Sequence, residues 1–486
     1  MGVAVESKTV RSASARRSKV ITSAIWNALP FVVFLVAYAF LPRFANDGLL
    51  LTLIYIGINV LLALGLNLLM GYAGQVSLGH AAFFGMGAYA SAILTVRPMP
   101  GEVIPGFSIA VGIMAGTAAL ISLTRVSGWK LAVGVSSFVL IAWLMRTINA
   151  NVAVLFVSFG ACGAALGALI RIDWRKVCAA GVITAASWLA SRWFLEGTLA
   201  RGGTSPWTGM VVGMMFTGLV AYLIGSQVLR LKGHFLAMAT LGFGIIVEIV
   251  FRQWTAVTGG SSDGIFNIGT IQFIDSMPRF GKRIFESLVG GHVDMRQQYF
   301  YLVWAFVFFA LLLANNIVRS RVGRAFRAVH GSELAAESLG VDTERYKVQV
   351  FVLSAAMASI AGSLHAHNAG IGYINPSEFS FVVSVQLMVM VVIGGLASVW
   401  GSLFGATTIQ LLKTWMLNLD KAHHQVFGLT LKGLDPIVFG AVLIVAMILV
   451  PQGLVRSTSD AIANSWRAMM SNRKKKAMLS EEQRSE

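Results

Sequence analysis

Long apolar runs constrain the fold of this chain more than any other feature of its sequence. There are about fourteen, and most approach the roughly 20 residues that an α-helix needs to cross the hydrocarbon core of a bilayer. The alternating segments of about ten residues that are typical of a membrane β-barrel do not occur. The sequence therefore predicts an all-α polytopic membrane protein, a bundle of about 14 transmembrane helices. The runs lie near residues 21–42, 49–70, 77–95, 107–124, 131–146, 152–170, 176–196, 207–228, 234–253, 299–318, 346–366, 380–397, 402–417 and 434–451.

The charged residues predict how these runs are oriented. The chain carries 38 Lys and Arg against 21 Asp and Glu, a formal net charge of +17. The basic residues collect at the ends of apolar runs, as they do in the cytoplasmic loops of membrane proteins. This location explains the positive net charge better than nucleic-acid binding does. With the basic residues 1–20 placed inside the cell, residues 319–345 and the tail at 456–486 are also inside, and the loop at 254–298 is outside. An even number of spans gives an N-in/C-in topology.

One apolar stretch, LNLLMGYAGQVSLGHAAFFGMGAYASA at residues 66–92, is interrupted by glycines and polar side chains. Irregular backbone at membrane depth is tolerated only against protein or a water-filled cavity. One interpretation is a broken or re-entrant segment beside a solute pathway, and the other is that the glycines let helices pack closely. The candidate pathway residues in this stretch are Asn67, Gln75, Ser77 and His80.

Two features elsewhere extend this hypothesis. Glu248 is the only acidic residue that falls well inside a predicted span, and such residues are candidates for a functional site. The alternative for Glu248 is a position at a helix end, facing water. Residues 393–406, IGGLASVWGSLFGA, repeat the glycine pattern, and Gly401 and Gly405 there predict a close contact between helices.

A hydrophilic segment, GRAFRAVHGSELAAESLGVDTERYKVQV at residues 323–350, interrupts the apolar runs. Ser332 is a favourable N-cap, Glu333 lies in the first turn, and Gly340 is typical of the residue that ends a helix. Asp342 or Thr343 can then cap the next span. Because an isolated helix of about seven residues is marginal in water, the segment is either a solvated connector or a rigid knob for a groove on a cytoplasmic partner. The predicted knob consists of Ser332, Glu333, Leu334, Ala335, Ala336, Glu337, Ser338, Leu339 and Gly340.

The sequence contains no constellation that would make the chain an enzyme. It has no glycine-rich loop ending in Lys of the kind that holds nucleotide phosphates, and no His-Glu-x-x-His pattern. His423 and His424 have no evident third ligand for a metal. Cys162 and Cys178 fit neither a disulfide framework nor a metal spacing. We therefore expect no catalytic residues, no cofactor and no metal site.

The hydrophilic segment continues as SELAAESLGVDTERYKVQVFVLSA, and this stretch resembles the cytoplasmic loop of ABC-importer permeases, most closely the LivM-type branched-chain amino-acid permease family. Six further blocks resemble that family, in its order, over about residues 49–98 and 207–455. They are GYAGQVSLGHAAFFGMGAY, LAMATLGFG, TGGSSDGI, GYINPSEFSF, VIGGLASVWGSLFGA and PQGL.

The resemblance implies partners and a mechanism. The chain would be one of two related permease subunits that form a channel in the cell inner membrane. Two cytoplasmic ATPase subunits would dock on the coupling helix, here Ser332 to Gly340, and a periplasmic binding protein would deliver the substrate. Branched-chain amino acids are the implied substrate, with short amides and urea left open. No nucleic-acid partner is implied.

The resemblance also divides the chain. The expected parts are a basic cytoplasmic N-terminus at 1–20, the first permease helices at 21–98, an insertion of extra membrane helices at 99–206, the permease core at 207–455 with its periplasmic loop 254–298 and cytoplasmic coupling loop 319–345, and a basic tail at 456–486.

Two other classes of protein compete with this interpretation. An ion-coupled secondary transporter usually has charged residues at membrane depth and an internal repeat, and the sequence offers one candidate acid and no obvious repeat. A polytopic membrane enzyme would need catalytic side chains clustered at membrane depth, and none are found in the sequence.

Overall fold

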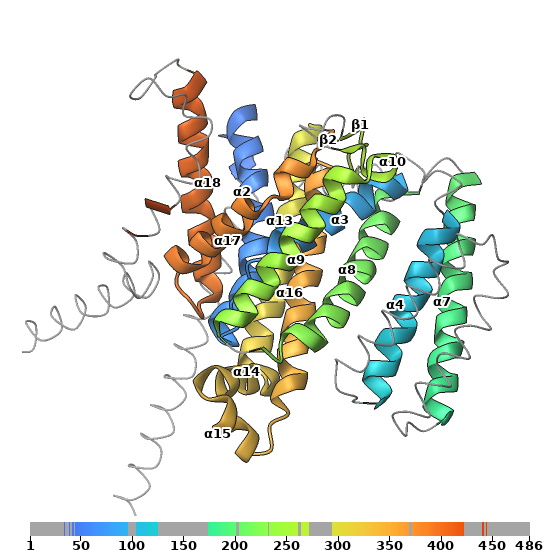
Figure 1. The fold of residues 1–486 in the computed structure, drawn as a ribbon. Coiled ribbons are helices and arrows are strands. Elements are labelled where there is room, and N and C mark those ends of the chain that lie inside the picture. The colour runs from blue at the N-terminus through green and yellow to red at the C-terminus, as the bar shows by residue number, and fades with distance from the viewer. Residues whose placement is uncertain are drawn as a thin grey trace, which may run out of the picture. The chain divides into compact units, whose positions relative to one another are not determined.

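The computed structural model describes residues 34, 38, 41, 42, 44–95, 104–124, 174–200, 204–231, 233–260, 264–271, 294–368, 372–421, 440, 441 and 444 (Figure 1). The predicted runs at 131–146 and 152–170 lie outside these residues, as do most of 21–42 and 434–451. The terminal segments 1–20 and 456–486, the middle of the 254–298 loop, Cys162, His423 and His424 also lie outside them.

The described residues are mostly helical, and helices occupy every predicted run that they cover. The α-helices are α2 (Asp47–Asn67), α3 (His80–Thr95), α4 (Ile104–Thr124), α7 (Trp174–Ala200), α8 (Pro206–Val228), α9 (His234–Gln253), α10 (Thr255–Thr258), α13 (Met295–Arg319), α14 (Arg321–Gly331), α15 (Glu333–Ser338), α16 (Thr343–Ala366), α17 (Phe381–Gly394) and α18 (Val399–Lys421). A π-helical turn, η1 (Leu68–Tyr72), a 3-10 turn, η2 (Pro376–Phe379), and two strands, β1 (Ile265–Phe266) and β2 (Tyr373–Ile374), complete the list.

Six of the described helices are long and apolar enough to cross a membrane, which supports a multi-pass membrane protein. They span Asp47–Tyr72, Cys178–Gly197, Pro206–Val228, His234–Gln253, Met295–Arg319 and Thr343–Ala366. The total of about 14 helices and the N-in/C-in topology remain predictions.

The chain divides into two compact units, and α2 and α13 run from one into the other. The first unit contains residues 1–54 and 272–305, and the second contains residues 55–271 and 306–486. Within the first unit, the beginnings of α2 and α13 are joined by an ion pair between Asp47 and Arg296 at 3.0 Å. The indole nitrogen of Trp304 also donates a hydrogen bond to the carbonyl of Leu53 at 3.1 Å.

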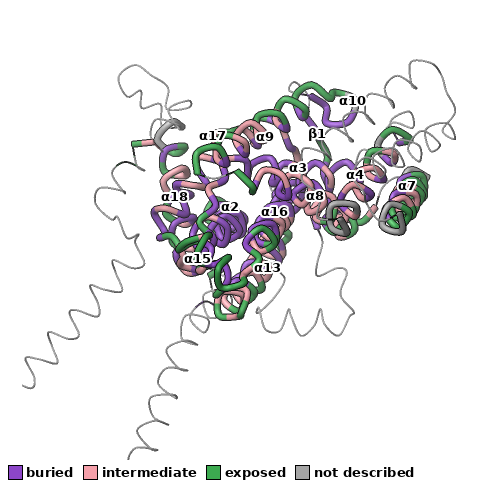
Figure 2. The backbone as a smooth tube through the Cα atoms, turned by 60° about the horizontal axis from the view of Figure 1, so that its bottom comes forward, coloured by how far each residue is buried: buried purple, intermediate pink, exposed green. Residues whose placement is uncertain are grey.

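The core of the second unit is built where α3, α8 and α16 pack on one another, and α3 and α16 are buried along most of their length (Figure 2). Glycines allow these helices to approach until their backbones touch. A Cβ atom added to Gly362 of α16 would overlap the carbonyl oxygen of Phe84 in α3, and one added to Gly87 of α3 would overlap the carbonyl oxygen of Ser359. Small residues at helix contacts are the usual basis of packing in lipid, where apolar side chains gain little by leaving the bilayer.

The ends of this unit differ. A short antiparallel ladder, in which Ile265 pairs with Ile374 and Phe266 with Tyr373, lies at one end. The helices α14 and α15 lie at the other end (Figure 1). Helix α16 joins the two ends, because its 24 residues begin beside α15 and finish seven residues before β2 starts at Tyr373. The pair α4 and α7 lies at the edge of the bundle beside α8 (Figure 1).

The glycine contacts generate a first prediction. Replacing Gly362 by Ala forces a methyl group into the backbone of α3, so the free energy of unfolding should fall by about 1–3 kcal/mol. Gly218→Ala provides a control, because Gly218 lies on the face of α8 toward α16 but has room for a methyl group. The nearest atom to the added Cβ would be Val352 Cγ1 at 3.9 Å. That control variant should unfold at or slightly above the temperature of the unaltered protein. The Tm of both variants in detergent tests this, and equal values would contradict the packing described here.

Candidate functional site

The predicted knob lies in the connector between α13 and α16, residues 320–342, which contains α14 and α15. Helix α14 begins at a capped end, because the hydroxyl of Ser320 accepts hydrogen bonds from the amides of Val322 and Gly323 at 3.1 and 3.4 Å. It buries Phe326 and Val329 against the rest of the unit. The sequence pattern predicts a basic loop here, so the separate helix α14 is a feature that only the structure reveals.

Local sequence determines both ends of α15. The hydroxyl of Ser332 accepts a hydrogen bond from the amide of Ala335 at 3.3 Å, as an N-cap does. At the other end Gly340 has a φ of +80°. Its amide bonds to the carbonyl of Glu337 at 2.9 Å, and the amide of Val341 bonds to that of Ala336 at 3.0 Å. This is a Schellman motif, so the predicted N-cap and C-terminal glycine are confirmed. Asp342, rather than Thr343, caps α16 by accepting from the amide of Arg345 at 3.1 Å.

Two polar contacts fix α15 to the first turns of α16. The Nζ atom of Lys347 lies 2.6 Å from Glu333 Oε1, with the Lys347 side chain 6% exposed and that of Glu333 25% exposed. The hydroxyl of Thr343 donates a hydrogen bond to Glu337 Oε1 at 2.7 Å. Both acidic side chains of α15 therefore have partners inside the protein.

The outward side of α15 and its C-cap carry two large apolar side chains. Leu334 is 72% exposed and Leu339 is 83% exposed, whereas Ala336 faces inward at 2%. No other large apolar side chain of the connector, residues 320–342, is exposed to this degree. The six-residue helix is thus held by polar contacts on its inner side and offers leucines on its outer side.

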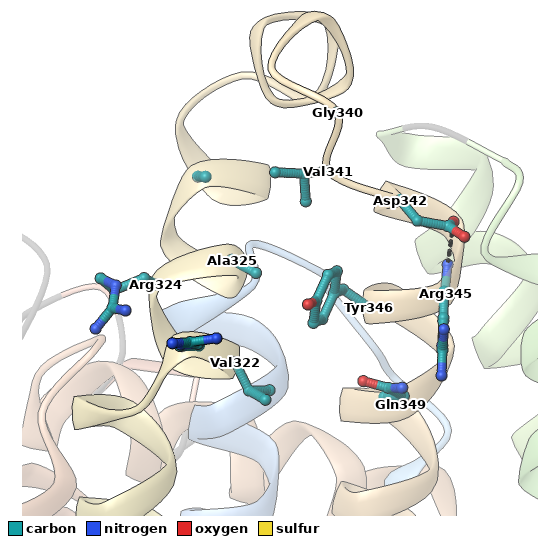
Figure 3. A pocket seen from close by; sticks show the side chains of 11 residues that line it. Val322, Arg324, Ala325, Gly340, Val341, Asp342, Arg345, Tyr346 and Gln349 are labelled. Carbon is teal, nitrogen blue, oxygen red and sulfur yellow. Dashed lines mark hydrogen bonds between the residues drawn. The ribbon is translucent and has the colours of Figure 1, made fainter.

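A groove of about 630 Å³ opens beside α15, between α14 and the start of α16. Figure 3 shows Tyr346 of α16 between Val322 and Ala325 on one side and Gln349 on the other. Three arginines line this groove together with one carboxylate, that of Asp342, so its rim is positively charged. The lining residues are Arg321, Val322, Arg324, Ala325, Ala328, Gly340, Val341, Asp342, Arg345, Tyr346 and Gln349.

The second candidate region is the interruption between η1 and α3, where residues 73–79 are not helical. Hydroxyl groups of three other helices bond to polar groups at the end of this segment and in the first turn of α3. The amide of Leu78 donates to Thr240 Oγ1 of α9 at 3.1 Å, and that of Ala81 donates to Ser384 Oγ of α17 at 3.1 Å. The imidazole of His80 bonds through Nε2 to Ser354 Oγ of α16 at 2.6 Å. The prediction of a broken helix is confirmed.

A second interruption lies between α17 and α18, where Gly395 and Ala397 have φ values of +107° and +58°. The side chain of Asn67, the last residue of α2, connects this second interruption to the helix that leads into the first. Its Oδ1 atom accepts from the amide of Ala397 at 3.0 Å, and its Nδ2 atom donates to the carbonyl of Ser398 at 2.7 Å. Gly401 and Gly405 pack against the backbone of α17, which confirms their predicted role in helix contact.

The structure brings together only part of the predicted pathway. Ser77 and His80 are hydrogen-bonded to each other, and both are buried, as are Asn67 and Gln75. Glu248 belongs to neither interruption. Its carboxylate pairs with Arg252 at 2.7 Å and accepts from the amide of Phe381, the first residue of α17, at 3.2 Å. Within the described residues it bonds to none of the other four candidates.

Three groups with buried or long-range contacts have little or no signal in the sequence. Lys347 lies 14 positions from its partner Glu333 in the sequence. The only sign that its ammonium group is buried is the position of Lys347 at the start of an apolar run. The partners of the interruption, Thr240, Ser354 and Ser384, are isolated hydroxyls in apolar runs. His330 Nδ1 lies 3.0 Å from the carbonyl oxygen of Gly71, a contact for which the sequence gives no signal. In the described part of the chain, no group of three His, Cys, Asp or Glu residues could hold a metal ion.

Comparisons with known proteins point to one family. A family model described as the permease component of the branched-chain amino acid transport system matches residues 48–186 and 174–450. The LivM permease protein of the high-affinity branched-chain amino acid transport system of Salmonella typhimurium is 31% identical over 264 residues, 53% of this chain and 59% of that protein. The chain therefore matches less than two thirds of the length of LivM. No solved structure matches.

Other relatives carry related names. The LivH permease protein of the Escherichia coli system is 30% identical over 155 residues, which is 32% of this chain and 46% of LivH. The BraD permease protein of Pseudomonas aeruginosa is 28% identical over 169 residues, 35% of this chain and 50% of BraD.

The geometry of α15 generates a second prediction. Glu333→Ala leaves the buried ammonium group of Lys347 without its carboxylate, which should cost about 3 kcal/mol of stability. Lys347→Met should cost less, because the partly exposed Glu333 can regain water. The exposed pair of Arg230 and Glu344, 2.7 Å apart at the same end of the unit, provides a control: Arg230→Ala should cost less than about 1 kcal/mol. The order of the three Tm values in detergent tests this, and a Glu333→Ala variant as stable as Arg230→Ala would contradict it.

Proposed function

Because the chain belongs to the family of permease components of branched-chain amino acid transport systems, we propose that it is a membrane-spanning permease subunit of an ATP-driven importer in the cell inner membrane. The substrate we propose is a branched-chain amino acid. The observation that carries the proposal is α15, a short helix that is fixed to α16 on one side and exposes two leucines on the other.

The end of the protein that carries α14 and α15 is proposed to face the cytoplasm. Four arginines lie within nine residues at and after the end of α13, and such clusters favour the cytoplasmic side. They are Arg319, Arg321, Arg324 and Arg327. The ladder of β1 and β2 lies at the opposite end, which would then face the periplasm (Figure 1). This arrangement agrees with the expected positions of the loops 254–298 and 319–345.

Helix α15 is proposed to be the coupling helix on which a cytoplasmic ATPase subunit docks. Leu334 and Leu339 would enter an apolar groove of the ATPase, and the arginine-lined groove beside α15 would face acidic residues around it. Since the contacts of Lys347 and Thr343 hold α15 on α16, a force applied to its leucines would be passed to a helix that runs to the opposite end of the unit.

The remaining partners follow from the same assignment. The likeness to both LivM and LivH supports pairing with a second, related permease subunit. A second ATPase subunit would dock on that partner, and a periplasmic binding protein would deliver the substrate. The helices α4 and α7 pack mainly on each other at the edge of the bundle, which fits an additional membrane segment within residues 99–206 (Figure 1).

The main competing function is ion-coupled secondary transport. It would use Glu248 as the coupling acid. Because the carboxylate of Glu248 is occupied by Arg252 and by the backbone of α17, a structural role fits its contacts better.

The source of energy is the third prediction. In cells that express the chain with its partner subunits, uptake of labelled leucine should stop when ATP is depleted while the proton gradient is held. Excess isoleucine or valine should compete with leucine, and urea or a short amide should not. Uptake that persists without ATP would instead support ion coupling.

The docking surface gives the fourth prediction. Leu339→Glu places a charge where an apolar groove is expected, so binding of the ATPase subunit should weaken by about tenfold or more. Leu231, which is 42% exposed in the link between α8 and α9, is the matched control, and Leu231→Glu should bind the ATPase normally. Copurification of the ATPase with each variant measures this. Equal yields from Leu339→Glu and Leu231→Glu would place the docking surface elsewhere.

A further inference from the structure

A side-chain hydrogen bond of His330 joins α14 to η1, the π-helical turn that comes directly before the interruption. His330 is in the last turn of α14, and its Nδ1 atom bonds to the carbonyl oxygen of Gly71 in η1 at 3.0 Å. We propose that His330 is a positioning residue, the joint through which displacement of α15 is transmitted to residues 73–79. This inference rests on the proposed function, in which α15 receives the movement of an ATPase.

The imidazole ring of His330, a residue exposed to solvent, lies beside Gly74 as well as Gly71. Gly74 has a φ of +69°, and a Cβ atom there would lie 3.2 Å from Cγ and Cδ2 of His330. Gly71, which supplies the accepting carbonyl, is confined by Asn67, since a Cβ atom there would overlap Asn67 Oδ1. The ring is therefore hydrogen-bonded to the turn at Gly71 and lies close to it at Gly74. A displacement of the ring has to move the turn or break the hydrogen bond.

No long linker separates α15 from the imidazole ring of His330. Ser332 is both the C-cap of α14 and the N-cap of α15. Its amide donates a hydrogen bond to the carbonyl of Ala328 at 3.1 Å, and its hydroxyl caps α15. His330 is separated from α15 by only Gly331 and Ser332. A shift of α15 is thus delivered to the last turn of α14, rather than absorbed by a flexible link.

The contact also reaches the second interruption. Gly71 lies one helical turn beyond Asn67, and the side chain of Asn67 bonds to the backbone of Ala397 and Ser398. Movement of η1 therefore changes the surroundings of both interruptions. Irregular backbone at membrane depth is where transporters place the parts that open and close. His330 is the side chain that ties this region to the end of the unit where the motor is proposed to bind.

The chemistry of the contact specifies the variants that test it. Because a carbonyl oxygen only accepts hydrogen bonds, Nδ1 of His330 must carry a hydrogen atom. An asparagine places an amide N–H close to the position of Nδ1, so His330→Asn can keep the bond, whereas His330→Ala removes it. Arg327, exposed on the same helix, serves as the control, and Arg327→Ala should leave the joint intact.

The experiment measures coupling in the full complex. The permease pair, the ATPase subunits and the binding protein are reconstituted in proteoliposomes, and the leucine transported per ATP hydrolysed is determined. We expect His330→Ala to retain the ATPases at wild-type yield and to hydrolyse ATP, while the transport ratio falls by about fivefold. His330→Asn should recover most of the ratio, and Arg327→Ala should match the wild type.

The two hypotheses fail in different ways. If wild-type uptake does not require ATP, the proposed function is wrong. If it does, and His330→Ala keeps the wild-type ratio, only the role of His330 is overturned. Should His330→Ala fail to assemble, hydrogen exchange of the wild-type complex decides the matter. Addition of an ATP analogue should change the exchange of amides in residues 71–79 at the same time as those in α14, and unchanged exchange at 71–79 would overturn the joint.

Discussion

Every part of this structure depends on one constraint: where a helix is interrupted at membrane depth, its free amides and carbonyls need partners that water cannot supply. Leu78, in the interrupted segment, obtains one from Thr240 of α9, Ala81 in the first turn of α3 obtains one from Ser384 of α17, and the His80 side chain bonds to Ser354 of α16. Three helices that are distant in sequence are thereby brought to one point. Hydrogen bonds to the irregular segment consequently specify which helices neighbour each other, a task for which apolar contacts in lipid are poorly suited.

Helix α15 is fixed by polar contacts on its inner side and exposes large apolar side chains. The carboxylate of Glu333 reaches the buried Lys347, that of Glu337 accepts a hydrogen bond from Thr343, and Leu334 and the C-cap Leu339 are exposed. The inner contacts hold in place a helix that is too short to be stable by itself. In the proposed function, a partner would cover the exposed leucines.

What could be predicted from the sequence is what short-range chemistry determines. The apolar runs located the helices, and Ser332 and Gly340 located both ends of α15, because caps involve residues only a few positions apart. The pairing of Lys347 with Glu333 and the choice of Ser354 for His80 could not be predicted, since they depend on how helices pack. Helix α14 lies between these cases. Its N-cap Ser320 and the spacing of Ala325, Phe326 and Val329 were present in the sequence, but the surrounding arginines hid that pattern.

The glycine contacts of the core have a consequence for how the protein changes shape. The backbone of one helix lies directly on a neighbouring helix where Gly362 contacts Phe84 and where Gly209 of α8 contacts Ser91 of α3. A change of side-chain rotamer cannot relieve such a contact, so one helix cannot slide past the other. We therefore expect these helices to move together as a rigid body. In the proposed transport function, the surfaces along which helices slide would therefore lie outside the trio of α3, α8 and α16, where side chains, rather than carbonyl oxygens, form the boundary.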